Sequence, residues 1–121
     1  MCIRDRKETD QIPEFVRRFP EAALPFQGAS GWLVQGAEIQ VAFVEFDEEV
    51  DVPEHSHAEQ WEIVLAGRVF LRMGGEEQEF LAGDHFFIPA GVPHSAKVEA
   101  GYRAVIVFNE PDRYRVRQGA G

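Results

Sequence analysis

The sequence predicts an all-β domain, because three features recur along most of its 121 residues. Apolar and polar residues alternate with a period of two, the spacing at which side chains of a strand share a face. The alternating segments are short, and Gly, Pro and Asp separate them at frequent intervals. Many short strands of this kind form a barrel or a sandwich. We therefore expect one domain with low helix content.

The composition supports a folded domain and excludes some partners. Hydrophobic residues make up 45% of the chain, and 21 acidic against 12 basic side chains give a formal net charge of −9. This charge repels nucleic-acid backbones and anionic membranes, so we expect neither as a partner. Cys2 is the single cysteine, which excludes an intrachain disulfide and fits a cytoplasmic protein. The longest apolar run, residues 104–108, is too short to span a bilayer.

The first part of the chain predicts an arm that leads into the first strands. Residues 1–11 are charged, and we expect them to be mobile. Residues 12–19 predict a short helical turn with Pro13 at an early position, so that residues 1–29 form a helical or irregular arm. Strands are expected at residues 32–34 and 38–46, and the second has two apolar faces, which favours cover on both sides.

Turn residues separate the remaining strands. Gly74-Gly75 between two alternating segments is typical of a β-hairpin. Gly67 predicts another turn, and the acidic residues 47–51 predict a connector. Further strands are expected at residues 60–66, 69–73, 77–81, 86–88, 95–98 and 102–108.

These elements place a β-domain at residues 30–108, followed by a tail at 109–121. The tail carries Arg113, Arg115 and Arg117. We expect a solvated end, with a basic contact to a partner as the alternative.

Three of the four histidines, His55, His57 and His94, predict a metal site. His55 and His57 are two residues apart, so on a strand their imidazoles point to the same face. His94 ends the second segment, which begins at Gly83. Three neutral imidazoles and one oxygen donor bind a divalent transition metal and leave positions open for water or substrate. His85 fits no ligand position, so we expect it at the surface or in a supporting role.

The fourth ligand is either Gln60 or Glu62. Counted back from the turn at Gly67, these two side chains share one face of the expected strand. An irregularity near Ala58-Glu59 is needed to bring that face to the histidine side.

The second segment resembles the second motif of the cupin superfamily, Gly-x5-Pro-x-Gly-x2-His-x3-Asn. The sequence carries it with full spacing as Gly83, Pro89, Gly91 and His94, with Val98 in place of the Asn.

The first cupin motif, Gly-x5-His-x-His-x(3,4)-Glu-x6-Gly, is matched by His55, His57 and Gly67, with Glu49 in place of the leading Gly. Spacing from Gly67 assigns the ligand position to Gln60, whereas spacing from His57 assigns it to Glu62. Some cupins use a His-Ser-His…Gln arrangement, and the glycine turn fixes the strand register. We therefore favour Gln60.

The resemblance implies a conical β-barrel of the jelly-roll type over roughly residues 30–108, usually assembled as a homodimer. It also implies one divalent transition metal per chain, Fe, Mn, Ni or Zn. The implied ligands are His55, His57, Gln60 and His94. The substrate does not follow from the fold, because cupins host many chemistries.

A set of neutral ligands leaves the charge of the metal uncompensated, which favours an anionic substrate such as a carboxylate or an enolate. Glu62 would then be a free inward carboxylate that acts as general acid or base, or alternatively as support for the ligands. The aromatic residues Phe43, Phe87 and Tyr102 are candidates to bind the substrate.

We therefore predict a metal-dependent enzyme acting on a small, oxygenated, anionic molecule. The reaction would be a Lewis-acid isomerisation or tautomerisation, as in the uronate ring-opening cupins that this ligand set resembles, or an Fe-dependent dioxygenation. A non-catalytic cupin that binds a metal or a small ligand is the alternative of a different class. A structural cupin with an empty site is a weaker third alternative.

Overall fold

A computed structural model describes residues 12–118 and shows a β-structure with one short 3-10 helix. The expected mobility of residues 1–11 lies outside the described residues. No helix in residues 12–118 is long and apolar enough to cross a membrane. The elements are η1 (Val16–Arg18), β1 (Ala29–Gln35), β2 (Gln40–Phe46), β3 (Val50–His55), β4 (Gln60–Ala66), β5 (Arg68–Met73), β6 (Glu76–Leu81), β7 (His85–Ile88), β8 (His94–Val98) and β9 (Tyr102–Phe108).

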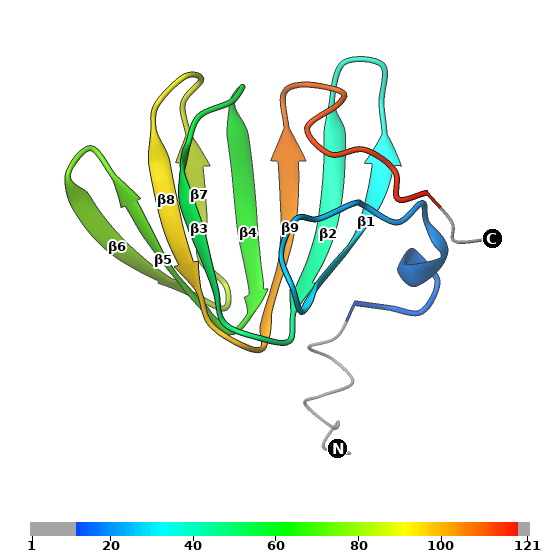
Figure 1. The fold of residues 1–121 in the computed structure, drawn as a ribbon, viewed down its shortest axis with the longest axis horizontal. Coiled ribbons are helices and arrows are strands. Elements are labelled where there is room, and N and C mark those ends of the chain that lie inside the picture. Colours follow the sequence, from blue (N-terminus) through cyan, green and yellow to red (C-terminus); the bar gives the residue numbers. More distant parts are fainter. Residues whose placement is uncertain (1–11, 119–121) are drawn as a thin grey trace.

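The strands form two antiparallel sheets around one core (Figure 1). One sheet has five strands in the order β1-β2-β9-β4-β7, and the other has four in the order β3-β8-β5-β6. Neighbouring strands are often far apart in sequence, because the chain passes repeatedly between the sheets. The core combines side chains of both inner faces, such as Val44, Val64, Leu71 and Val98. The predicted all-β barrel is confirmed.

Alternation along the strands decides which side chains enter the barrel. In β9, Tyr102, Ala104, Ile106 and Phe108 are all buried, and the residues between them are half-buried. The same alternation buries Gln40, Ala42, Val44 and Phe46 of β2 and Gln60, Glu62 and Val64 of β4. These are the face assignments that the period-two pattern predicts.

The strand β3 forms where the sequence predicts the end of an acidic connector. Val50 is buried and pairs with Val98 of β8, whereas the neighbouring Asp51 is exposed. β3 is an edge strand of its sheet. Charged residues are common on such strands because one side of the strand remains in water. The acidic composition therefore concealed a strand.

The N-terminal arm covers the outer face of the five-stranded sheet near β1 and β2. Ile12 and Val16 are buried against Trp32, and Phe19 meets Phe43 with ring centroids 6.1 Å apart. The arm therefore explains why both faces of β2 are apolar. Farther along this outer face, large side chains at β4 and β7 remain exposed, namely Trp61, Leu65 and Phe87.

The C-terminal tail is bound to the barrel, which corrects the expectation of a solvated end. Figure 1 shows it running from the end of β9 back past β2 and β1. The backbone of Tyr114 is hydrogen-bonded to the buried side chain of Gln40, with N–O distances of 3.0 and 2.8 Å. Beyond it, Val116 forms an antiparallel bridge with Ala22 of the arm. The tail therefore lies against the arm.

Candidate metal centre

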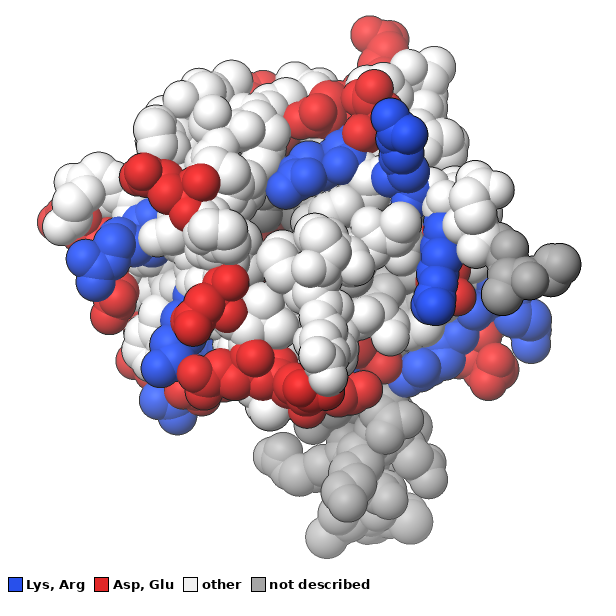
Figure 2. Space-filling model, viewed as in Figure 1, with Lys and Arg blue, Asp and Glu red and all other residues white. Residues whose placement is uncertain are grey.

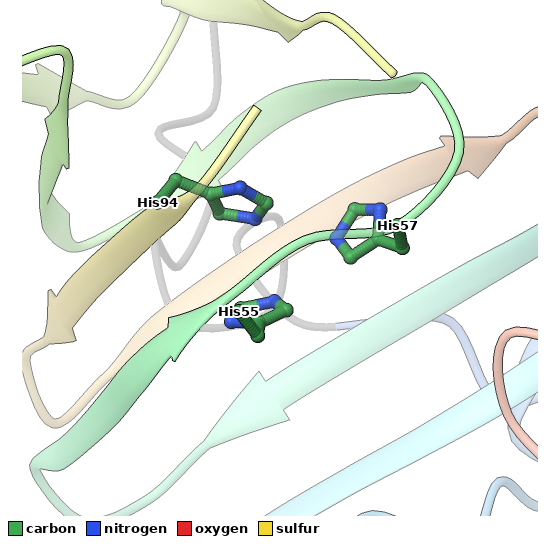
Figure 3. A group of neighbouring side chains, drawn as sticks. All are labelled: His55, His57 and His94. Carbon is green, nitrogen blue, oxygen red and sulfur yellow. The ribbon is translucent and has the colours of Figure 1, made fainter. Parts of the chain in front are cut away.

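The three predicted histidines meet inside the barrel (Figure 3). Their ring centroids are 5.1 Å apart for His55 and His57, 4.3 Å for His55 and His94, and 4.8 Å for His57 and His94. Their potential ligand atoms all lie within 4.8 Å of one another. This spacing is what a single shared ion requires.

The sequence predicted that His55 and His57 lie on the same strand, but the backbone brings the histidines together in another way. His55 is the last residue of β3 and pairs with His94, the first residue of β8. His57 follows in the loop after β3, and the ladder is irregular between Val52 and His55. A bend at Ala58 then leads into β4, which confirms the irregularity that the sequence required. Convergence therefore depends on one strand end, one loop and one neighbouring strand.

Backbone carbonyls fix the orientation of all three rings. The Nδ1 atoms lie 2.9 Å from Pro53 O for His55, 2.7 Å from Ala58 O for His57 and 2.9 Å from Val92 O for His94. A carbonyl oxygen only accepts hydrogen bonds, so Nδ1 carries the proton in each ring. Each neutral imidazole therefore keeps its lone pair on Nε2, as a metal ligand requires.

Burial also favours the neutral form of His57 and His94. Burial lowers the pKa of His57 and of His94, and the positive charge of Arg113 acts in the same direction. The Nε2 atom of His57 is buried and has no hydrogen-bond partner among the described residues. Unpaired buried polar atoms are rare in folded proteins. A divalent metal ion would satisfy this atom, so the residues fit the predicted ion.

Gln60 and Glu62 both point into the barrel but differ in their contacts. The Nε2 of Gln60 donates a hydrogen bond of 2.7 Å to Oε1 of Glu62, and the hydroxyl of Tyr102 donates to Oε2. The amide oxygen of Gln60 is therefore the atom available as a ligand. Burial raises the pKa of Glu62 to about 7, although both hydrogen bonds act to lower it. Its carboxylate does not belong to the group formed by the histidines.

A cavity next to the histidines occupies the barrel interior, with about 80 Å³ open to the centres of water molecules. One water needs roughly 10–15 Å³ on this measure, so the cavity has room for several waters or one small organic molecule. Most of its lining is apolar, which is typical of a small-molecule site. The polar side chains of the lining are His55, Gln60, Glu62, His94, Tyr102, Arg113 and Tyr114.

Of the three aromatic residues predicted to bind a substrate, the structure places one at this cavity. Tyr102 lines it, whereas Phe43 and Phe87 do not. Phe43 points outward and packs against Phe19 of the arm, and Phe87 is 50% exposed on the outer face beside its strand partner Trp61. The alternation of side chains along a strand could not show which face points to the cavity, because both faces of these strands are apolar. Residues of the opposite parity, Phe46 and Phe86, line the cavity instead.

Arg113, which the sequence predicted to lie in a solvated tail, lines this cavity. Its guanidinium lies 4.5 Å from the ring centroid of Tyr114 and 5.7 Å from that of Phe108. Its Nε is buried and has no hydrogen-bond partner within residues 12–118. The periodic pattern ends at Asn109, so no strand register could have placed this side chain at the cavity.

Comparisons with known proteins agree with this architecture. Residues 42–108, more than half of the chain, match the family described as Cupin domain. No curated protein matches the sequence.

Solved structures of similar fold include a RmlC-like cupin from Shewanella frigidimarina, with 23% identity and a TM-score of 0.68 over 80% of this chain and 87% of that one. KdgF from a Halomonas species has 22% identity and a TM-score of 0.66, covering 76% of this chain and 86% of that one. An oxalate decarboxylase variant from Bacillus subtilis has 16% identity and a TM-score of 0.66, covering 79% of this chain but 28% of the enzyme. At these identities the likeness shows the fold. Together with the family match, it shows that the chain belongs to the cupin family.

Proposed function

We propose that this protein is a metal-dependent enzyme that acts on a small, oxygenated, anionic molecule. The carrying observation is the convergence of three imidazoles whose Nε2 lone pairs are left free by backbone contacts to Nδ1. His55, His57 and His94 would hold the ion together with the amide oxygen of Gln60. A divalent ion held there would supply a Lewis-acid centre that polarises a substrate oxygen, or a site for oxygen chemistry if it were iron. Mn, Fe, Ni and Zn all suit this donor set.

The size and charge of the cavity support the choice of substrate class. The space beside the histidines suits a molecule of a few heavy atoms. The proposed ligands are all neutral, so the charge of the ion would be balanced best by an anionic substrate. One structural relative, the Bacillus subtilis oxalate decarboxylase, is described with Mn(II) centres. That enzyme acts on a small carboxylate by its name, and it supports this substrate class by fold analogy only.

Glu62 is proposed to orient Gln60. Its two oxygens accept hydrogen bonds from the Gln60 amide and the Tyr102 hydroxyl, so the carboxylate holds the amide in one orientation. Proton transfer by Glu62, the other role expected from the sequence, would require a substrate to replace one of these two partners. A redox-neutral isomerisation or tautomerisation is the reaction in which such a transfer would occur.

Metal analysis of the protein, purified without a polyhistidine tag, tests the first part of the proposal. We expect close to one equivalent of Mn, Fe, Ni or Zn per chain and loss of that metal in His57→Ala. His85→Ala is the matched control, because His85 is exposed on the outer face near Trp61. A wild-type protein that takes up none of the four metals would overturn the proposal.

Activity of the metal-loaded protein tests the second part. Small carboxylates, including uronates, and diketones would be incubated with the protein, with products followed by NMR and oxygen consumption by electrode. Product formation without oxygen uptake supports the isomerase reaction, and stoichiometric oxygen uptake supports the dioxygenase. Stoichiometric metal binding with no turnover of any compound would favour the alternative of a non-catalytic binding cupin.

A further inference from the structure

We propose that Arg113 binds the carboxylate group of the substrate at the mouth of the cavity, and that Gln40 positions Arg113 through the backbone of Tyr114. This inference rests on the proposed function, because it assigns the recognition of the anionic substrate at the same site. It extends that function by naming a residue outside the cupin motifs. Besides the metal ion, Arg113 would be a second positive charge at the cavity that attracts the anionic substrate.

The mouth of the cavity lies where the inner cavity and a groove on the outer surface share lining residues. A shallow groove on the outside is lined by Phe26, Val52, His55 and Arg113, and the same four side chains line the inner cavity. The entrance therefore lies between the N-terminal arm, the strand β3 and the C-terminal tail. Arg113 stands at this entrance, beside the path of a ligand that enters through the groove toward the histidines.

Among the described residues, Arg113 has no ion-pair partner at this position, although Asp51 lines the outer groove and Glu62 lines the inner cavity. Two other arginines are partly buried, Arg17 and Arg103, and both form ion pairs with Glu45. No carboxylate among residues 12–118 forms an ion pair with Arg113, although the whole chain has a net charge of −9. Figure 2 shows that acidic atoms gather along the lower edge of the molecule, and that basic atoms with acidic atoms next to them lie beside a hollow in its upper half. A partly buried cation without a partner favours an anionic ligand.

The free donor atoms of Arg113 suit a carboxylate. Its Nε is buried and has no hydrogen-bond partner in the described part of the chain. A guanidinium binds a carboxylate with two parallel N–H donors, and Nε with one terminal nitrogen forms such a pair. A bound carboxylate would therefore satisfy the buried Nε and the charge together. The rings of Tyr114 and Phe108 hold the guanidinium from its sides.

Gln40 fixes the backbone that carries Arg113. Its Oε1 accepts the N–H of Tyr114 at 3.0 Å, and its Nε2 donates to the carbonyl of Tyr114 at 2.8 Å. Nε2 also donates to Oε1 of Gln35 at 3.0 Å, and Gln40 has no exposed surface. The side chain of Gln40 therefore bonds both backbone groups of Tyr114, as a neighbouring strand would do, although the tail itself is irregular. Gln40 is therefore a positioning residue for Arg113.

The substrate class becomes narrower as a result. One end of the molecule would carry a carboxylate for Arg113, and the other end a hydroxyl, keto or second carboxylate oxygen directed to the histidines. A purely structural role for Arg113, as a cover packed on two aromatic rings, would show no preference between a charged and a neutral ligand.

The test is a calorimetric titration of malonate, with the uncharged malonamide as matched ligand, into the full chain in metal-free and Zn(II)-loaded forms. We expect Arg113→Gln to weaken malonate binding at least about tenfold, because a hydrogen-bonded charge pair is lost. Arg113→Lys should retain part of the affinity, since it keeps the charge but not the paired donors. Arg115→Gln, at an exposed position two residues away, should bind as the wild type does.

Gln40→Leu tests the positioning role. We expect weaker malonate binding with unchanged malonamide binding and unchanged metal content, and Gln40→Glu serves the same purpose if the leucine variant does not fold. The inference is overturned if the metal-free wild type does not bind malonate, or if Arg113→Gln binds malonate within twofold of the wild type. A protein that takes up no metal overturns the proposed function alone, because the metal-free titration still measures the contribution of Arg113.

Discussion

The side-chain amide of Gln60 donates a hydrogen bond of 2.7 Å to the carboxylate of Glu62, so the two candidates for the fourth ligand are partners of each other. The contact assigns the amide nitrogen of Gln60 to Glu62 and leaves the amide oxygen for an ion. Tyr102 occupies the second carboxylate oxygen, which keeps Glu62 in place. The proposed ligand and its proposed support therefore lie on one strand, two residues apart.

Metal affinity should distinguish the two roles. We expect Gln60→Ala to remove a ligand, and Glu62→Ala to weaken binding about 10–100-fold by releasing the orientation of Gln60. Competition of Zn(II) between each variant and a chelator of known affinity measures both effects. Unchanged affinity in Gln60→Ala together with complete loss in Glu62→Ala would exchange the roles assigned to the two residues.

Metal removal should lower the stability of the folded protein. At an ion concentration 100 times the dissociation constant, binding stabilises the native state by about 2.7 kcal/mol, which raises the Tm of a domain of this size by about 10 °C. Thermal unfolding with Zn(II) and with EDTA measures this difference. We expect no shift in His55→Ala combined with His57→Ala, since the ligands are gone, while His85→Ala should keep the full shift.

Removing the hydroxyl of Tyr102 should destabilise the protein. Tyr102 is 1% exposed and its hydroxyl bonds the buried Glu62, so Tyr102→Phe leaves a carboxylate oxygen without this donor. The expected loss is about 1–3 kcal/mol in the free energy of unfolding, measured by urea denaturation. Tyr114→Phe is the control, because the Tyr114 hydroxyl has no hydrogen bond within residues 12–118. An equal effect of the two substitutions would contradict the importance assigned to the Tyr102–Glu62 contact.

The turn at Gly67 should tolerate no side chain. Its φ is +82°, and a Cβ there would lie 2.7 Å from the Cα of Tyr102. Gly83 has a φ of +94°, but a Cβ there would meet no atom within 4 Å, so its substitution reports backbone strain alone. We expect Gly83→Ala to cost about 1–2 kcal/mol, and Gly67→Ala a further 1–3 kcal/mol or so because the backbone of Tyr102 must move. Chemical denaturation that gives equal losses would refute the close approach.

The sequence was sufficient for the barrel and for the histidines because both depend on local spacing. Period-two alternation placed β4 and β9 at their observed limits, and the turn at Gly67 set the register that puts Gln60 and Glu62 inside. The motif spacing brought together His57 and His94, although the route through a strand end and a loop differed from the expected one.

The rest of the site depends on contacts that local spacing does not encode. Arg113 reaches the cavity because Gln40, far away in the sequence, holds the tail by side-chain to backbone bonds. Phe43 and Phe87 were predicted to bind the substrate but lie on the outer face of the sheet, because apolar residues alternate in the same way on an outer and an inner face. For Phe43, the packing of the arm explains why an outward-facing residue is apolar. Long-range polar contacts and cover of an outer face are tertiary properties.

The contacts of the C-terminal tail with earlier parts of the chain have a consequence for synthesis. Arg117 contacts Glu21 across 96 positions of sequence, and Tyr114 contacts Gln40 across 74. A ribosome therefore releases the strands, the histidines and the arm before the segment that closes the entrance. Until that segment emerges, Arg113 and Tyr114 cannot line the cavity, which they share with His55 and His94. The wall of the cavity is therefore completed only after the last strand and both segments that carry the histidines have left the ribosome.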